Sequence, residues 1–426
     1  MSEPIKQNPD QSRLTARIAA EQVVRRLQGA GFIAYFAGGC VRDQLLGLEP
    51  TDFDVATDAR PDGVEALFPR LRQVGEAFGV MLIRWHGHQI EVASFRVDGL
   101  YSDQRRPDEI TFTDAEHDAQ RRDFTINGMF YDPVTETVID FVEGRDDLKN
   151  RVIRAIGDPG ARFGEDHLRV LRAVRFAARF GFTIESNTAE AIREGDLSGV
   201  SRERIGQEVR LMLINPNRAV AAWEMQYYGL DQQVLNESSC LLAPTRLSRL
   251  PEEVSYSTAL AAWWLDRKTP PQNLELMSAL PTTTPNAVDD SRGWTKALTL
   301  SNAEGGNLEA CLRAYRQIMT KWDRAGVAWQ KRLAATDAFR EAIMLVQTVH
   351  PARFVEVRRR VSHLEKTGLA PIPLITGEDL IQMGLPPGPQ FKSVLEAVYD
   401  AQLEGLVSTK EEGMRMAGHI HHTISE

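Results

Sequence analysis

Two aspartates separated by one residue, Asp52 and Asp54, are the clearest sign of chemistry in this sequence. They begin the alternating segment 52–57, which is typical of a short strand whose alternate side chains share a face. Two carboxylates held side by side repel each other unless a cation lies between them, and oxygen-ligated Mg²⁺ is the usual cation. A lone Asp-x-Asp is more often a solvated strand edge, so the residues around the pair must decide.

A glycine pair, Gly38 and Gly39, lies between an expected buried strand over 32–37 and an expected short helix over 40–48. Such a turn brings backbone N–H groups and a helix N-terminus close to a phosphate. Arg42, one turn into the helix, adds a guanidinium suited to the same anion. Two glycines alone more often form a structural turn. Here the aspartate pair follows, so adjacent elements would supply a phosphate site and the metal that phosphates need.

A third carboxylate is expected from the neighbouring strand over 89–97, in which Glu91 is the candidate. The alternation of a strand places Glu91 on the same face as Ala93 and Phe95. A glutamate beside these apolar residues is unusual for a solvent-facing surface, which favours a role in the site.

The segment 121–127 combines two arginines, an acid and an amide at helical spacing. Arg122 and Asn127 could reach ribose hydroxyls or phosphate, and Asp123 could hold them in place by pairing. A helix start with Asp123 near its N-cap explains the same residues equally well.

A stripe of arginines is expected on one face of a helix over 164–180. Its members are spaced by three, three and four residues, namely Arg169, Arg172, Arg175 and Arg179. The opposite face is apolar, with Leu168, Leu171, Val174 and Ala178. A solvated basic face normally uses Lys and includes Glu, whereas an all-Arg stripe is better suited to phosphate.

The expected elements indicate an α+β region followed by helices. The first 145 residues or so mix helices and strands, with helices over 13–31 and 61–68 and a strand pair at 80–85 and 89–97. Strand signals then fade, and helices are expected over 164–180, 186–195, 201–213 and 217–228 and through most of the remainder. Pro- and Thr-rich interruptions at 280–293 and 367–376 predict linkers or surface loops.

Composition narrows the class of protein. The 426 residues suggest two to four domains, and 42% hydrophobic and 26% charged residues are ordinary for a folded chain. The net charge of −9 excludes a globally basic nucleic-acid coat, although a local basic face remains possible. Three scattered cysteines fit neither a disulfide framework nor a Cys-rich zinc site, and they favour a reducing cytoplasm. No long apolar run or signal peptide is expected, so no membrane association is predicted, and nothing identifies a protein partner.

Together these segments resemble the class II tRNA nucleotidyltransferase and poly(A) polymerase family, and bacterial CCA-adding enzymes most. The resemblance covers residues from about 30 to 215. It rests on Gly38-Gly39-x-x-Arg42-Asp43, Asp52-x-Asp54, Glu91, Asp98-Gly-x-Tyr101-x-Asp103-x-Arg105-Arg106-Pro107, Arg121-Arg122-Asp123-Phe-Thr-Ile-Asn127, Glu165-Asp166-x-x-Arg169 and Ser201-x-Glu203-Arg204. A weaker match at 374–389 is similar to the tail of bacterial CCA-adding enzymes. Gly128 stands where the family usually has Ala, which is a small-for-small change.

The resemblance implies a polymerase-β-like nucleotidyltransferase head with a mixed sheet, followed by an all-α neck, body and tail. The head would span 13–145 after a disordered lead-in over 1–12. The neck would span 146–230, the body 231–365 and the tail 366–426, with body and tail holding tRNA.

The resemblance also implies roles for single residues. Asp52 and Asp54 would bind two Mg²⁺ ions with Glu91 in support, and the tRNA 3′-hydroxyl would attack the α-phosphorus of CTP or ATP. The nucleotide would be held by Gly38, Gly39, Arg42, Arg122, Asp123, Asn127, Asp166, Arg169, Arg172 and Arg175. A flexible loop containing Asp98, Gly99, Tyr101, Asp103, Arg105 and Arg106 would permit addition of A.

Base choice follows from hydrogen-bonding capacity. Asp166 only accepts and Arg169 only donates, which fits the amine and ring nitrogen of either C or A. G and U present a carbonyl to Asp166 and would be rejected.

The substrates would be CTP, ATP and the 3′ end of tRNA, with no role for DNA. The segment 74–80 lacks the basic run typical of poly(A) polymerases, and the loop from Asp98 to Pro107 has the length that CC-only enzymes lack. An A-adding enzyme or poly(A) polymerase of the same family stays open. Outside this activity, an inactive RNA-binding relative and a metal-dependent phosphodiesterase are the alternatives.

Overall fold

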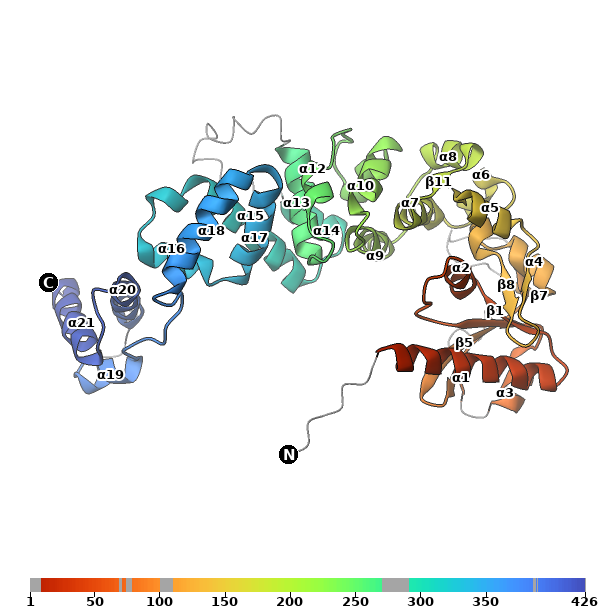
Figure 1. Cartoon of the computed structure of the whole chain (residues 1–426), viewed down its shortest axis with the longest axis horizontal. Coiled ribbons are helices and arrows are strands. Elements are labelled where there is room, and N and C mark those ends of the chain that lie inside the picture. The colour runs from red at the N-terminus through yellow and green to blue at the C-terminus, as the bar shows by residue number, and fades with distance from the viewer. Residues whose placement is uncertain are drawn as a thin grey trace. The chain divides into compact units, whose positions relative to one another are not determined.

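The chain divides into two compact units, residues 1–241 and 242–426, each of which is described by itself. The computed structural model describes residues 9–68, 71–73, 79–99, 110–269, 291–385, 388 and 390–425 (Figure 1). Four residues of the expected loop, Tyr101, Asp103, Arg105 and Arg106, lie outside these ranges. The same is true of residues 74–78 and of most of the expected linker at 280–293.

A seven-stranded sheet organises the first unit, with strand order β3-β4-β5-β2-β1-β8-β9. Only β2 and β5 run parallel among its neighbouring strands, so the sheet is mixed as expected. The strands are β1 (Ala34–Ala37), β2 (Asp54–Thr57), β3 (Leu71–Gln73), β4 (Val80–Trp85), β5 (His88–Ser94), β8 (Phe130–Asp132) and β9 (Thr137–Ile139). Two short pairs stand apart, β6 (Arg96–Asp98) with β7 (Ile110–Phe112) and β10 (Val152–Ile153) with β11 (Thr183–Ile184).

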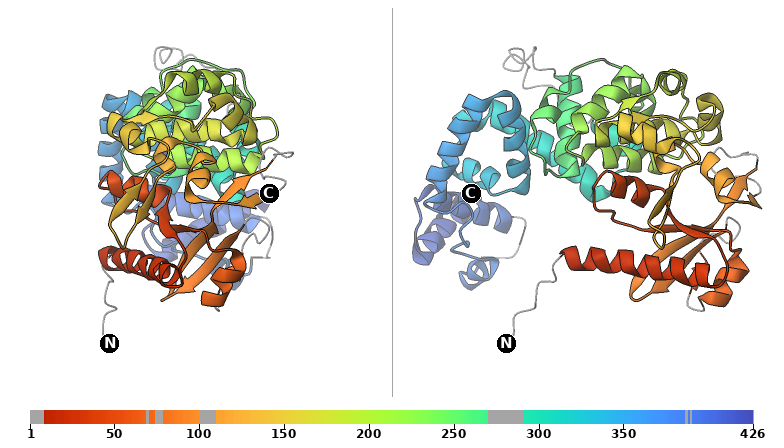
Figure 2. Two further views of the ribbon diagram at one scale, coloured as in Figure 1. Left: turned by 90° about the vertical axis from the view of Figure 1, so that its right-hand side faces the viewer. Right: turned by 45° about the vertical axis from the view of Figure 1, so that its right-hand side comes forward.

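Helices lie on both faces of this sheet. Helix α1 (Pro9–Gly29) packs along β1, β2, β4 and β5 on one face (Figures 1 and 2). Helix α4 (Ala115–Gln120) meets the other face, where Ala119 joins a core with Ala37, Ala56, Phe95 and Phe130. Burying alternate residues of the same strands on opposite faces produces the period of two seen in the sequence.

The remaining elements of the first unit are mainly helices. They are α2 (Gly39–Leu45), α3 (Pro61–Leu67), the 3₁₀ turn η2 (Thr125–Asn127), α5 (Gly144–Asn150), α6 (Pro159–Glu165), α7 (Leu168–Phe180), α8 (Ser186–Arg193), α9 (Arg202–Leu213), α10 (Arg218–Tyr227) and α11 (Leu230–Leu235). Helix α7 packs against α6, α9 and α10. Its expected apolar face is buried throughout, at Leu168, Leu171, Val174 and Ala178.

Three local predictions were wrong. Strand β2 begins at Asp54 and not at residue 52, because its partner β1 ends where the chain turns away at Gly38. The helix expected over 164–180 is two helices that break at Asp166 and His167, where the Asp166 carboxylate accepts the backbone N–H of Leu168 at 3.1 Å. Residues 121–127 begin no α-helix, since 121–124 connect α4 to the short 3₁₀ turn η2, which occupies the last three residues.

In the part of the second unit that the structure describes, the regular elements are all helices. Its helices are α12 (Thr245–Arg249), α13 (Tyr256–Lys268), α14 (Ser291–Ala297), α15 (Asn302–Thr320), η5 (Trp322–Arg324), α16 (Val327–Ala334), α17 (Asp337–Val349), α18 (Pro351–Glu365), α19 (Gly377–Gln382), α20 (Gln390–Glu404) and α21 (Lys410–Ser425). The interruption expected at 367–376 is present, because no helix or strand occupies that segment between α18 and α19.

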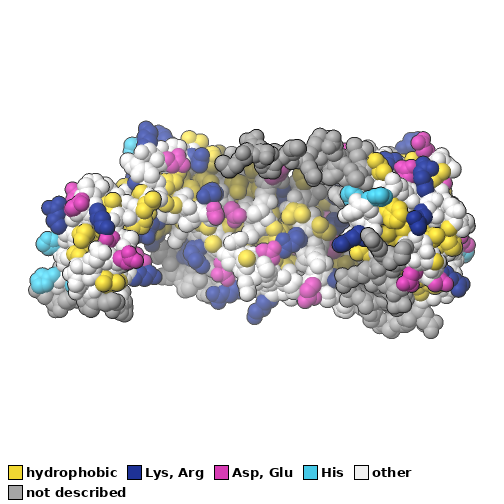
Figure 3. Space-filling model, turned by 90° about the horizontal axis from the view of Figure 1, so that it is seen from below, with side chains coloured by type: hydrophobic (Ala, Val, Ile, Leu, Met, Phe, Trp, Pro, Cys, Tyr) yellow, Lys and Arg dark blue, Asp and Glu magenta, His cyan; other side chains and the backbone are white. Residues whose placement is uncertain are grey.

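Positive and negative side chains are mixed on one face of the molecule. Figure 3 shows Lys and Arg side chains interspersed with Asp and Glu, without one continuous basic field on the face that it presents. Among the described residues, no helix has both the length and the apolar character needed to cross a membrane.

Candidate active site

Three carboxylates come together at one end of the parallel pair β2 and β5. The register pairs Val55 with Val92, both buried, so the preceding residues Asp54 and Glu91 lie side by side on the opposite face. Both side chains are exposed to solvent. Even so, the pKa of Asp54 is raised to about 6. The largest cause is partial desolvation, followed by the negative charges of Glu91 and Asp52. The predicted grouping of Asp52, Asp54 and Glu91 is therefore present.

The oxygen donors of this cluster fit a divalent cation. The pKa of Asp54 is raised by desolvation and by the negative charges of its neighbours, and the positive charge of a bound cation would lower this pKa again. In the described part of the chain, no group of three His, Cys, Asp or Glu residues is arranged to enclose a metal ion. An open pair of carboxylates is nevertheless what Mg²⁺ commonly uses, since it keeps water and substrate phosphate as its other ligands.

The glycine turn lies beside this cluster. Gly38 has φ 71° and ψ −124°, so the backbone requires glycine, and a Cβ at this position would lie 3.0 Å from Nη1 of Arg122 and press on that side chain. Arg122 also acts on Asp54, because its positive charge lowers the pKa that the neighbouring carboxylates raise. The turn, Arg122 and Asp54 therefore adjoin one another.

Asp118 holds Arg122 in this position, although the sequence analysis did not single it out. Its buried carboxylate accepts hydrogen bonds from Arg122 Nη2 at 2.9 Å and from Arg121 Nη2 at 2.7 Å. The ring of Phe130 supports the Arg122 guanidinium from one side, 4.9 Å from the ring centroid. The signal was present in the sequence, since Asp118 precedes the two arginines by three and four residues.

Arg42 does not point freely into the turn. Its side chain is only 5% exposed, and it donates to Asp43 from Nε at 2.8 Å and to Asn127 Oδ1 from Nη1 at 2.5 Å. Asn127 in turn donates to Asp123 Oδ1 at 3.0 Å. The expected nucleotide-binding residues Arg42, Asp123 and Asn127 therefore form one buried network.

The Asp123 carboxylate of this network has a strongly lowered pKa. Burial opposes its ionisation. The charge of Arg172 and hydrogen bonds from Asn127 and Arg172 outweigh burial and lower the pKa of Asp123 to about 2. Arg172 donates to Asp123 Oδ2 from Nε at 2.8 Å and from Nη2 at 2.5 Å. The pairing expected of Asp123 is thus present, with an arginine that lies 49 positions further along the chain.

Each arginine of the α7 stripe has an acidic partner. Arg169 pairs with Glu165 at 2.5 Å, Arg175 with Glu208 at 2.6 Å, and Arg179 with Asp43 at 3.2 Å. The stripe is therefore not a solvated basic face, and its suitability for phosphate stays a prediction. Glu208 and Asp43 were not predicted as site residues.

Asp166 and Arg169 lie at the break between α6 and α7 but have different partners. Asp166 Oδ2 accepts from Arg204 Nη2 at 2.7 Å, and Arg169 Nη1 donates to Glu165 and to the Arg162 carbonyl. Both side chains are therefore held in place by protein. Arg204, part of a quoted motif but absent from the expected site, supplies one of these restraints.

The start of the expected loop is tied to the same region. Asp98 in β6 accepts from Arg96 at 2.9 Å and from Arg121 at 3.5 Å. Gly99 follows the end of this strand and is exposed. The base of the loop is thus held next to the segment that contains Arg122.

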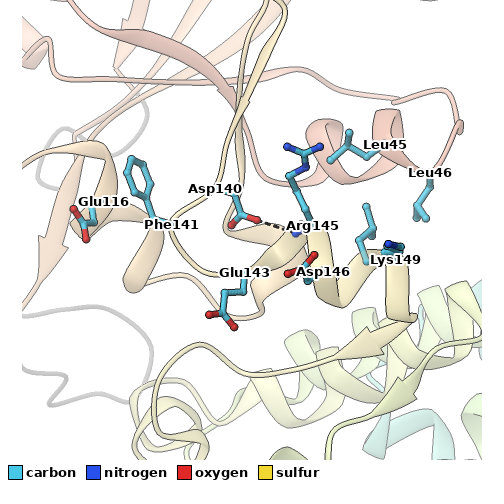
Figure 4. Close-up of a pocket in the computed structure, with 10 residues that line it drawn as sticks. Leu45, Leu46, Glu116, Asp140, Phe141, Glu143, Arg145, Asp146 and Lys149 are labelled. Atoms are coloured by element: carbon cyan, nitrogen blue, oxygen red, sulfur yellow. Dashed lines mark hydrogen bonds between the residues drawn. The ribbon is translucent and has the colours of Figure 1, made fainter.

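A separate surface pocket of about 1030 Å³ lies at the other end of α2 (Figure 4). Leu45 at the end of α2, Leu46 directly after it, and Arg145 and Lys149 from α5 contribute to its wall. It contains none of the residues predicted for the site. The carboxylate cluster, rather than this pocket, therefore remains the candidate for catalysis.

Comparison with known proteins identifies the class first. Residues 34–154 match the family model described as the poly A polymerase head domain. This stretch includes the glycine turn, the three carboxylates and Arg122. The first unit is thus a nucleotidyltransferase head continued by helices.

Relatives of the whole chain define the family. The CCA-adding enzyme of Geobacillus thermodenitrificans is 34% identical over 405 residues, covering 92% of this chain and 93% of its own. The crystal structure of Bacillus stearothermophilus CCA-adding enzyme in complex with CTP is similar, with TM-score 0.71 and 27% identity over 96% of this chain and 98% of that one. A Thermotoga maritima CCA-adding enzyme complexed with tRNA shares the fold, with TM-score 0.62 and 20% identity over 97% of this chain and 96% of that one. The chain belongs to the family of CCA-adding enzymes.

Proposed function

We propose that this protein adds C, C and A to the 3′ end of tRNA from CTP and ATP and releases pyrophosphate. The observation that supports this most directly is the grouping of Asp52, Asp54 and Glu91 beside the Gly38 turn and Arg122, in a chain related to CCA-adding enzymes over nearly its whole length. An inactive RNA-binding relative would have no need to keep three mutually repelling carboxylates.

Asp52 and Asp54 would hold two Mg²⁺ ions, with Glu91 in support. When bound, these ions would lower the pKa of the attacking 3′-hydroxyl and neutralise charge on the leaving pyrophosphate. The protein's own part is to keep the two carboxylates aligned. Strand β2 does so for Asp54 by fixing its backbone between β1 and β5.

The triphosphate would bind at the Gly38–Gly39 turn and Arg122. The absence of a side chain at Gly38 leaves the guanidinium of Arg122 against the turn, and Asp118 fixes its direction. Arg122 can therefore meet a phosphate group without losing much side-chain entropy, because the protein has already ordered it.

The base would bind at Asp166 and Arg169. The restraints from Arg204 and Glu165 leave the acceptor and the donor in fixed directions, as selection by hydrogen-bond pattern requires. C and A present a matching donor and acceptor to this pair, whereas U and G present a carbonyl to the Asp166 carboxylate.

The four-part layout is proposed on the same basis. Residues 13–145 would be the head, 146–230 the neck, 231–365 the body and 366–426 the tail. The helices of body and tail would hold the tRNA while its 3′ end reaches the head.

The test uses purified protein and three tRNAs, ending before, within and after the CC sequence, each with one nucleotide triphosphate at a time. We expect CTP to extend the first two, ATP to extend only the tRNA ending in CC, and pyrophosphate to appear in equal amount. Addition of A alone would identify an A-adding enzyme, and long A tails would identify a poly(A) polymerase. RNA shortening or no incorporation would contradict nucleotidyl transfer.

A further inference from the structure

A ring made of side-chain hydrogen bonds and of the α7 backbone between Arg172 and Arg179 joins α2 to α7 within the first unit. It contains two residues of α2, two of the segment 123–127 and two of α7, namely Arg42, Asp43, Asp123, Asn127, Arg172 and Arg179. The contact from Arg179 to Asp43 closes the ring and links positions 136 residues apart.

Asp43 accepts hydrogen bonds from one arginine of each helix. Its Oδ1 accepts from Arg42 Nε at 2.8 Å and lies 2.7 Å from Arg42 Nη2, while its Oδ2 accepts from Arg179 Nη2 at 3.2 Å. The Asp43 side chain is 10% exposed and that of Arg179 is 38% exposed. One largely buried carboxylate therefore bridges two guanidinium groups that come from different helices.

Aromatic rings of α7 support the same contact. The Arg42 guanidinium lies over Phe176 and Phe180, 5.1 and 4.8 Å from the ring centroids. Arg179 lies over Phe180 at 4.8 Å. Stacking of a planar guanidinium on a ring restricts its orientation as well as its position. The junction between α2 and α7 is thus defined by charge and by packing together.

The two helices lead to different parts of the proposed site. Helix α2 begins at the Gly38 turn beside Arg122 and Asp54, and α7 begins beside Asp166 and contains Arg169 in its first turn. Under the proposed function, the first end receives a triphosphate and the second a base of the same nucleotide. The spacing of the helices must then match the length of that nucleotide.

We propose that Asp43 is a positioning residue that holds α2 at a set spacing from α7 through Arg179, so that both ends of one nucleotide bind together. This inference rests on the proposed function. Neither Asp43 nor Arg179 is required to touch the reacting atoms. If the spacing loosens, each end of the nucleotide still finds its own subsite, and only the advantage of binding both at once is lost.

The experiment compares Arg179→Gln and Asp43→Asn with the unchanged full chain. It measures KM for CTP and, separately, inhibition constants for inorganic triphosphate with Mg²⁺ and for CMP. We expect KM for CTP to rise about tenfold in either variant, while the inhibition constants for the two halves stay within about twofold. Arg179→Lys should recover part of the loss, and the double variant should lose no more than either single one.

Arg154→Gln is the matched control. Arg154 is also a partly exposed arginine of the first unit and pairs with Asp147 at 3.0 Å, outside the ring. It should leave all three constants unchanged. Since Arg179 is partly exposed, Arg179→Gln is expected to fold even if Asp43→Asn does not, and its melting temperature provides the check.

Several results would overturn the inference. A matching rise in the inhibition constant for triphosphate or CMP would mean that Arg179 contacts that group directly. Additive losses in the double variant would mean that Arg179 does not act through Asp43, and an unchanged KM would mean that the ring is structural only. An unchanged chain that neither binds nor incorporates CTP would instead overturn the proposed function itself.

Discussion

The carboxylates at the end of β2 and those around α7 are the same chemical groups in opposite electrostatic surroundings. Asp54 lies near Glu91 and Asp52, and desolvation together with these two negative charges raises its pKa to about 6. Asp123 faces Arg172 and Asn127, and its pKa is lowered to about 2 despite burial. The first region is left short of positive charge, whereas the second supplies each acid with an arginine.

This difference separates two tasks. A region with uncompensated charge gains free energy when a ligand of opposite charge binds, so it is suited to a metal and its substrate. A region whose charges are already paired gains little from a ligand but resists displacement of its side chains. The carboxylate cluster is therefore suited to the reaction, and the α7 network is suited to holding geometry.

The largest expected effect is on the uncompensated side. Asp54→Asn should lower nucleotide incorporation by about 10³-fold, because it removes a proposed metal ligand that supplies several kcal/mol. The free energy of unfolding without metal should stay the same or rise, since a repelling charge is lost. Radiolabelled CTP incorporation and urea unfolding measure the two quantities, with Glu65→Gln, an exposed acid on α3, as control. Turnover within about tenfold of the unchanged chain would refute the metal assignment.

In the α7 network, where the charges are paired, a substitution should lower the free energy of unfolding. Asp123→Asn keeps the shape of the buried side chain but leaves Arg172, whose own side chain is 34% exposed, without its counter-charge. We expect a loss of about 2–3 kcal/mol in the free energy of unfolding of the first unit, measured by urea denaturation. An equal loss for Asp54→Asn would abolish the distinction between the two regions.

A packing change beneath the network sharpens the comparison. A Cβ at Gly128 would lie 2.6 Å from Val142 Cγ2 and 3.0 Å from Ile156 Cδ1, next to the turn that holds Asn127. Gly128→Ala should therefore cost about 1–3 kcal/mol by overpacking, contrary to the small-for-small expectation. Thermal unfolding measures the loss, and Val142→Ala in the same chain should restore most of it. If Gly128→Ala leaves the stability unchanged, the side chains around Gly128 can move to make room for the added methyl group.

The smallest expected effect is on pH dependence. Because the pKa of Asp54 in the folded chain exceeds its ordinary value of 3.8, its ionisation costs stability above about pH 6, and that cost disappears as the pH falls towards 4. Below pH 6, Mg²⁺ must displace a proton, so its apparent affinity should fall by up to about tenfold per pH unit. Asp123, with a pKa near 2, stays ionised over this range.

Titration of Mg²⁺ at pH 7, 6 and 5, followed by thermal unfolding, measures this dependence. Asp54→Asn should remove it along with most of the Mg²⁺ stabilisation. A pH dependence that persists in Asp54→Asn would mean that another group competes with the ion.

Much of the fold could be predicted because period and turn chemistry act locally. The buried stripe of α7, the alternation of β5 and the positions of α8, α9 and α10 follow from which residues share a face of one element. The errors came where a neighbouring element decides the outcome. Strand β2 starts late because β1 ends at Gly38, and the 164–180 helix is divided at Asp166 and His167.

The sequence by itself determined which chemical groups are available and which of them lie close along one strand or helix. Asp52 and Asp54 are two residues apart, and Asp118 precedes Arg122 by one helical turn, so their proximity needs no distant contact. Only the tertiary structure decided which charges compensate each other. Asn127 meets Arg42 across 85 positions, Arg172 meets Asp123 across 49, and Arg179 meets Asp43 across 136. Such pairs depend on how separate elements pack. The spacing of residues along one helix or strand does not tell which other element packs against it.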